Sequence, residues 1–218
     1  MLGGLRAGWR GLLHLQYRGY QYIWANILWI ALSLPIITIP AAWAGLTRFS
    51  YYAHRQPTAS FDEFWQGFRE NLKRGLVIGI LNVVLVVVNL TNLYAYQYAT
   101  GAGVMVLRII WLFALFIWFA IQLYVWTLLN AMEQPNLKGA YRNAAVMILL
   151  NPLFTIGVWL VCAVVVVFSM VFPVAWILLT GSTLAAIANT AVQDRLRAAG
   201  YERNSMDIPT EEVFSDTY

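Results

Sequence analysis

Long apolar runs, separated by short segments that carry charges, are the dominant pattern along this chain. An apolar run of about 20 residues crosses a hydrocarbon core of about 30 Å as a helix, whereas a membrane β-strand alternates polar and apolar residues over about 10 positions. The runs here are continuous, and we therefore predict an all-α fold, a polytopic membrane helix bundle that forms a single membrane domain over residues 1–218. About five transmembrane helices are expected within 22–190, at residues 22–46, 75–99 and 104–130 and as two helices within 144–190 that part near Ser169.

Two prolines interrupt the first apolar run, in the stretch LSLPIITIPAAWAG. Pro35 and Pro40 each remove a backbone hydrogen-bond donor and disfavour a straight helix. We predict a kinked span, and the alternative is a re-entrant segment that leaves both of its flanks on the cytoplasmic side. A third interpretation is a cleaved signal peptide, because residues 42–45, Ala-Trp-Ala-Gly, resemble a cleavage site. Cleavage there would leave five positive residues in an outside loop, which argues against it.

The positive residues predict the orientation of the bundle. Only 11% of the residues are charged, against roughly 25% in soluble domains. With five spans and an outside N-terminus, ten of the 14 Lys and Arg residues lie in the first loop, the third loop and the tail, so we expect a cytoplasmic C-terminus in a bacterial plasma membrane. A re-entrant first segment would place 13 inside and only Arg108 outside. Because these residues flank spans, we expect them to contact anionic lipid, and we predict no binding of nucleic acid.

Three segments outside the spans have their own composition. Residues 1–21 mix Arg6, Arg10 and Arg18 with Leu, Trp and Tyr, which is typical of an amphipathic helix in the headgroup region. Residues 60–74, SFDEFWQGFRENLKR, predict a second amphipathic helix, parallel to the membrane on its cytoplasmic side. The tail 201–218 is rich in acidic residues and is expected to be disordered.

The helix over 60–74 has a defined start and one apolar stripe. Ser60 followed by Glu63 predicts a capping box. Apolar residues then recur at spacings of three and four, which places them on one face, and this face is predicted to meet either the membrane interface or a partner protein. The stripe consists of Phe61, Phe64, Trp65, Phe68 and Leu72.

Polar side chains within the spans are few, and none of them is a carboxylate. Four asparagines are predicted to make hydrogen bonds between helices or to line a polar cavity; they are Asn82, Asn89, Asn151 and Asn189. His14 and His54 lie outside the spans without a second ligand at metal spacing, and Cys162 is read as a small apolar filler. We therefore predict no enzyme activity, no metal and no cofactor.

One stretch resembles a known family. Residues 26–52, NILWIALSLPIITIPAAWAGLTRFSYY, followed by FDEFWQGFRENLKRG, resemble the YesL family of small bacterial integral membrane proteins. The resemblance is carried by an Asn-x-Leu-Trp opening, a Leu-Pro and a Pro-Ala in the first apolar run, a basic end, and the spacing of the aromatic helix. The matching residues are Asn26, Leu28, Trp29, Leu34, Pro35, Pro40, Ala41, Arg48, Phe61, Phe64, Phe68 and Asn71. Ile27 and Ile39 depart from the residues usual in that family.

The resemblance implies an accessory role rather than a catalytic activity. Members of that family are associated with carbohydrate uptake systems of the ATP-binding-cassette type, and no catalytic residues can be carried over. It therefore implies an auxiliary subunit of a small-molecule transporter, with membrane lipid and ABC transporter subunits as partners. Two other functions stay open on the sequence: a self-contained transporter or channel, and a structural subunit of a larger membrane complex.

Overall fold

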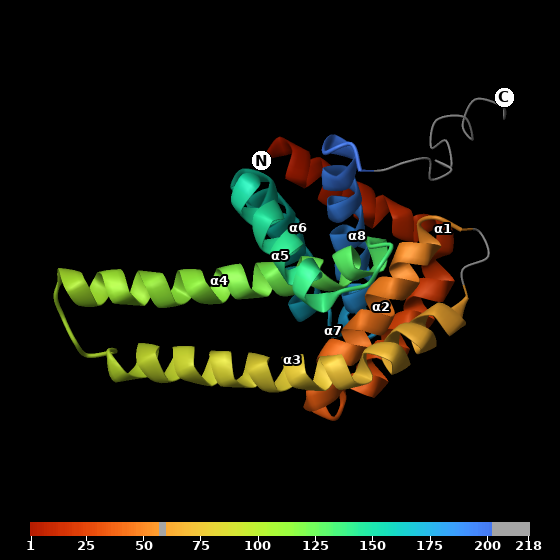
Figure 1. Cartoon of the computed structure of the whole chain (residues 1–218). Helices are drawn as coiled ribbons and strands as arrows, with labels where there is room; N and C mark the ends of the chain where they lie inside the picture. Colours follow the sequence, from red (N-terminus) through yellow and green to blue (C-terminus); the bar gives the residue numbers. More distant parts are fainter. Residues whose placement is uncertain (57–59, 202–218) are drawn as a thin grey trace.

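The computed structural model describes residues 1–56 and 60–201, apart from the side chains of residues 16–18, and folds this part of the chain into helices without a strand (Figure 1). The prediction of an all-α membrane protein is confirmed. The elements are α1 (Leu2–Ser33), a 3-10 turn η1 (Ile36–Thr38), α2 (Ile39–Ala53), α3 (Phe61–Ala95), α4 (Ala102–Ala131), α5 (Leu137–Leu150), α6 (Pro152–Val171), α7 (Pro173–Ala175), a π-helical turn η2 (Trp176–Thr180) and α8 (Gly181–Ala198).

Four helical segments of the described chain are long and apolar enough to cross a membrane, one fewer than the five spans predicted. They are Phe61–Ala95, Ala102–Ala131, Pro152–Val171 and Pro173–Ala198. The last two part at Phe172, three residues beyond the predicted break, where Pro173 begins a new helix. The missing span is the first one, residues 22–46.

The first predicted span is a pair of helices that fold back on each other. Pro35 caps η1 and Pro40 lies in the first turn of α2, where the N–H that proline lacks has no helical partner. The rings of His14 and His54 stack with centroids 3.6 Å apart, so the C-terminal end of α2 lies beside the middle of α1. The prediction of a kinked span is therefore wrong, and the chain has the hairpin geometry of the re-entrant alternative.

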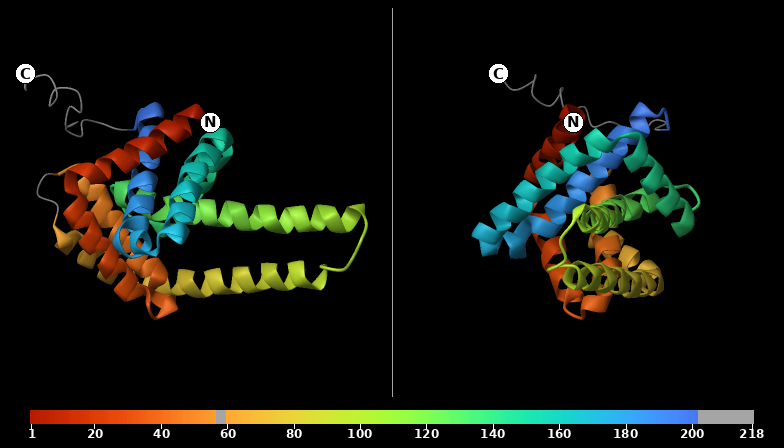
Figure 2. Two further views of the ribbon diagram at one scale, coloured as in Figure 1. Left: turned by 180° about the vertical axis from the view of Figure 1, so that it is seen from behind. Right: turned by 90° about the vertical axis from the view of Figure 1, so that its left-hand side faces the viewer.

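Charged residues are excluded from three long segments of the sequence. Residues 19–47, 75–132 and 143–193 contain no Lys, Arg, Asp or Glu except Arg108. Each segment contains one reversal of the chain: residues 34–38 between α1 and α2, residues 96–101 between α3 and α4, and Phe172 between α6 and α7. Three helical hairpins with uncharged turns, α1–α2, α3–α4 and α6–α8, thus make up most of the described chain, and α5 connects the last two. Figure 2 shows their arrangement.

Small residues let the helices of the hairpins approach closely. A Cβ added at Gly75 of α3 would lie 2.7 Å from the backbone nitrogen of Ala41 in α2, and one added at Gly45 would lie 2.7 Å from the carbonyl oxygen of Phe64. The first part of α1 packs on α6 in the same way, with Gly8 against Val161. Residues 1–21 are therefore the beginning of a continuous, packed α1 rather than a separate element. The predicted tail, apart from Tyr201, lies outside the described residues.

Candidate functional site

The predicted aromatic helix over 60–74 is the first part of α3 and runs without a break into the second predicted span. Ser60 is its N-cap, and the Ser60 hydroxyl accepts a hydrogen bond from the Asp62 N–H at 3.3 Å. Glu63 does not complete the capping box. Its carboxylate instead accepts from Arg48 of α2 at 3.1 Å, and Arg48 also donates to Glu70 at 2.8 Å. These ion pairs hold the charged end of α3 on α2.

The aromatic stripe mostly faces the protein's own core. Phe64 is fully buried and Phe68 nearly so, in one cluster with Phe49 of α2, and Leu72 packs against that cluster. Phe64 and Phe68 are therefore not available to a partner, contrary to the prediction, and Leu72 is partly buried. Only Phe61, which is 40% exposed, and Trp65, which is 38% exposed, keep substantial accessible surface. The Trp65 ring also stacks on Phe68, and the guanidinium of Arg69 lies over the Trp65 ring, 4.8 Å from the ring centroid.

The four predicted asparagines have separate partners and are not gathered around one cavity. The Asn82 oxygen accepts from Trp118 at 2.8 Å and from Gln122 at 3.1 Å, which joins α3 to α4. The Asn189 amide donates to the Thr47 carbonyl at 3.1 Å and so joins α8 to α2. The other two, Asn89 and Asn151, donate to carbonyls of their own helices, and the Asn151 oxygen also lies 3.4 Å from Arg195.

Asn26, which the sequence marked only through the family resemblance, makes a more extensive contact. Its amide donates to the carbonyls of Trp176 and Ile177 at 3.0 and 2.7 Å, and its oxygen accepts from the Ser182 N–H at 3.0 Å. These are backbone groups at the irregular turn η2, where the helical ladder is interrupted. The Ser182 hydroxyl in turn donates to the Tyr22 carbonyl at 2.7 Å. The polar triplet Gly181-Ser182-Thr183 within an apolar run is the sequence signal that could have indicated this junction.

The titratable side chains of the described residues form no recognisable catalytic or metal site. No group of three His, Cys, Asp or Glu residues among them could hold a metal ion. His54 donates to the Ser50 carbonyl at 2.7 Å, and its other ring nitrogen lies 3.4 Å from the Thr190 hydroxyl. Cys162 is buried in the core. Burial raises the pKa of Tyr141 above its ordinary value, and a hydrogen bond from Gln122 partly offsets this increase. The Gln122–Tyr141 hydrogen bond joins α4 to α5, and the His54–Thr190 contact joins the end of α2 to α8.

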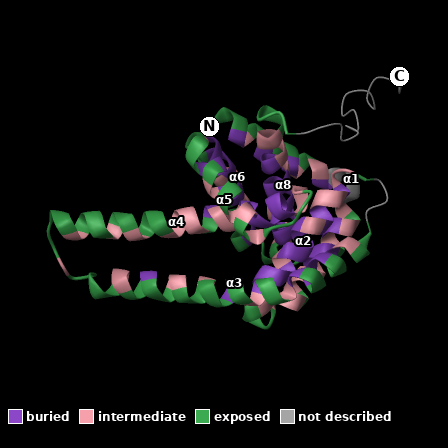
Figure 3. Cartoon of the chain, in the orientation of Figure 1, coloured by how far each residue is buried: buried purple, intermediate pink, exposed green. Residues whose placement is uncertain are grey.

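A long uncovered apolar surface lies on residues 76–119, which we call the arm. It consists of the C-terminal part of α3, the turn, and the first part of α4, and it extends away from the other helices (Figures 1 and 2). Figure 3 shows it mostly exposed, whereas buried residues concentrate in the remainder of the molecule. Strongly exposed side chains occur on both helices; among them are Val77, Val87, Leu90, Met105, Ile109 and Phe113.

The arm is closed by hydrogen bonds at its two ends. Asn82 joins its helices near the base. At the tip, Arg108 donates to the carbonyls of Tyr96, Gln97 and Ala99, so its charge satisfies the C-terminus of α3. Between these two points, no hydrogen bond joins α3 to α4 in the described part of the chain. The sides of the arm are thus apolar and open to lipid or to another helix.

Comparison with known proteins shows that part of the chain is similar to a known family. Residues 22–93 match the family described as "Protein of unknown function, DUF624". The matched segment contains the second part of α1, the proline turn, α2 and almost all of α3. No curated protein and no solved structure matches the chain. From the buried Tyr22 to Leu93, near the tip of the arm, the chain is therefore similar to an uncharacterised protein family, whose description assigns no activity.

Proposed function

We propose that this chain is an accessory integral membrane protein, an auxiliary subunit of a small-molecule transport system of the bacterial plasma membrane. The transported molecule is a sugar, and the partner is a membrane subunit of an ABC transporter. The single observation that carries the proposal is the arm, which offers two long, uncovered apolar helices and no reactive group. The resemblance of residues 26–71 to the YesL family supports the choice of transporter.

The arm suits a helical partner as well as lipid. In a bilayer, helices associate through close packing and interhelical hydrogen bonds rather than through the hydrophobic effect. In the described part of the chain, hydrogen bonds between the helices of the arm occur at Asn82 and at the Arg108 tip, so a third helix can pack along their open sides without breaking a hydrogen bond between them. The predicted docking surface therefore moves from Phe64 and Phe68 to the arm.

The proposed topology follows from the three hairpins. The charged segments beside these hairpins lie in or at the cytoplasm, together with both termini, and the turn of the arm lies toward the other face. This arrangement leaves Arg108 as the single positive residue on the outer side, and it satisfies the positive-inside rule more fully than five spans do.

The test is co-purification with matched variants. The protein is solubilised in a mild detergent, and transporter subunits recovered with it are quantified by mass spectrometry. We expect Ile109→Ala/Phe113→Ala, which trims exposed residues of the arm, to reduce recovery several-fold. The control Leu160→Ala/Val164→Ala trims residues of similar exposure on α6 and should leave recovery unchanged.

Two results would contradict the proposal. One is purification as a lone protein together with normal sugar uptake in a deletion strain. The other is solute flux in liposomes that contain this protein alone, which would identify a self-contained transporter or channel instead.

A further inference from the structure

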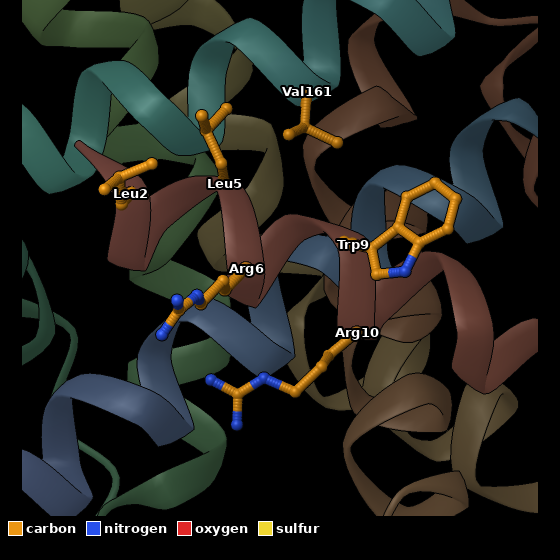
Figure 4. Close-up of a pocket in the computed structure, with 6 residues that line it drawn as sticks. All are labelled: Leu2, Leu5, Arg6, Trp9, Arg10 and Val161. Carbon is orange, nitrogen blue, oxygen red and sulfur yellow. The ribbon is translucent and has the colours of Figure 1, made fainter.

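The N-terminal part of α1 carries a surface that combines two guanidinium groups with apolar side chains. An open cavity of about 780 Å³ lies there, and Figure 4 shows its lining. Arg6 and Arg10 extend to the same side of α1, while Leu5 and Trp9 lie between them and the α6 side chain. The lining residues are Leu2, Leu5, Arg6, Trp9, Arg10 and Val161.

The charge of this surface is incompletely neutralised. Arg10 donates to the Asp194 carboxylate at 2.6 Å, and Arg195 donates to the other oxygen of the same carboxylate at 2.7 Å. One acid is thus shared by two bases. Arg6 forms no ion pair with any residue that the structure describes. The guanidiniums of Arg6, Arg10 and Arg195 and the single carboxylate of Asp194 leave two net positive charges, which favours an anion at this position.

The apolar side of the cavity continues along α6. Beyond Val161, exposed residues recur at helical spacing toward the turn at Phe172; they are Val164, Val167 and Val171. From Val161 to Val171 the helix rises about 15 Å, which equals half of a hydrocarbon core of about 30 Å. The surface therefore presents positive charge at one end and an apolar path one leaflet long at the other.

We propose that this surface binds an anionic phospholipid of the leaflet at the charged ends of the hairpins. The lipid phosphate accepts hydrogen bonds from Arg6 and Arg10, the Trp9 indole lies at the glycerol level, and an acyl chain follows α6 from Val161. Trp9 is 61% exposed, as expected of a belt residue at the interface. This site is independent of the transport role proposed above.

Native mass spectrometry of the full chain in detergent tests the site. Phosphatidylglycerol and phosphatidylcholine with identical acyl chains are titrated separately. We expect the protein to retain phosphatidylglycerol at least fivefold more tightly, Arg6→Gln to remove most of this preference, and Trp9→Ala to weaken retention of both lipids. Arg142→Gln, which removes one exposed charge from α5, is the matched control and should behave as the wild type.

Three results would overturn the proposal. The first is an unchanged lipid preference in Arg6→Gln. The second is an equal loss in Arg142→Gln, because the preference would then follow net charge rather than a site. The third is displacement of phosphatidylglycerol by an equal concentration of inorganic phosphate, which would indicate an anion site that ignores the acyl chain. Melting temperatures of the variants, measured beside the binding, confirm that each is folded.

Discussion

The body of the molecule and its arm both contain helices apolar enough to cross a membrane, but these helices are held in different ways. In the most apolar stretch of Pro173–Ala198, which belongs to the body, 56% of the residues are buried, against 6% in that of α4. In the body, Asn26 and Asn189 reach across to other helices. In the outer arm, Asn89 and Asn92 donate to carbonyls of their own helix.

This difference shows which interactions hold helices together in lipid rather than in water. Apolar side chains are solvated as well by lipid tails as by each other, so hydrophobicity alone does not collapse the arm onto the body. Close backbone approach and hydrogen bonds between helices hold the body together. The body is therefore the more closely packed region, and the arm leaves most of its apolar side chains uncovered.

The largest expected effect comes from filling a close contact of the body. A Cβ at Gly75 meets the backbone of Ala41, whereas one at Gly103, in the first turn of α4, meets nothing within 4 Å. We expect Gly75→Val to separate α2 from α3 and to lower the free energy of unfolding by about 3 kcal/mol or more. Gly103→Val should change it by about 0.5 kcal/mol at most.

Reversible unfolding in mixed micelles with sodium dodecyl sulfate, followed by circular dichroism, measures both glycine variants. Equal losses in the two would show that the arm is packed as tightly as the body, and the contrast between the two regions would be wrong.

The same contrast explains what could be predicted from the sequence. The expected span 104–130 agrees with α4, Ala102–Ala131, because the need for about 20 apolar residues is a local property of the chain. The first span could not be predicted in this way. Pro35 and Pro40 are compatible with a kink or with a reversal, and the outcome depends on packing between residues far apart in the sequence, such as His14 and His54.

The candidate site could also be predicted from the sequence only in part. Helical spacing correctly placed the five stripe residues on one helix, but Phe64 is fully buried and its neighbour Trp65 is 38% exposed. Periodicity identifies an apolar face without saying what covers it. For Asn26, the partners are backbone groups some 150 residues away, exposed by a helical irregularity that no propensity scale indicates.

A smaller effect is expected from removing one amide in each region. Asn26→Leu leaves the carbonyls of Trp176 and Ile177 without this partner inside the body, and we expect a loss of about 2–3 kcal/mol of unfolding free energy. Asn92→Leu removes only a bond within α3 and should cost about 0.5 kcal/mol or less. The same unfolding assay compares them, and a larger loss in Asn92→Leu would reverse our ranking of the two regions.

The smallest effect is confined to the tip of the arm. Arg108 donates to three carbonyls of the turn after α3, and Arg108→Ala removes these bonds without touching the body. We expect amides of residues 96–101 to exchange with deuterium about fivefold faster in nanodiscs, equivalent to about 1 kcal/mol of local stability, while exchange in α8 and global unfolding stay unchanged. Faster exchange in α8 as well would mean that the arm and the body open together, as one cooperative unit.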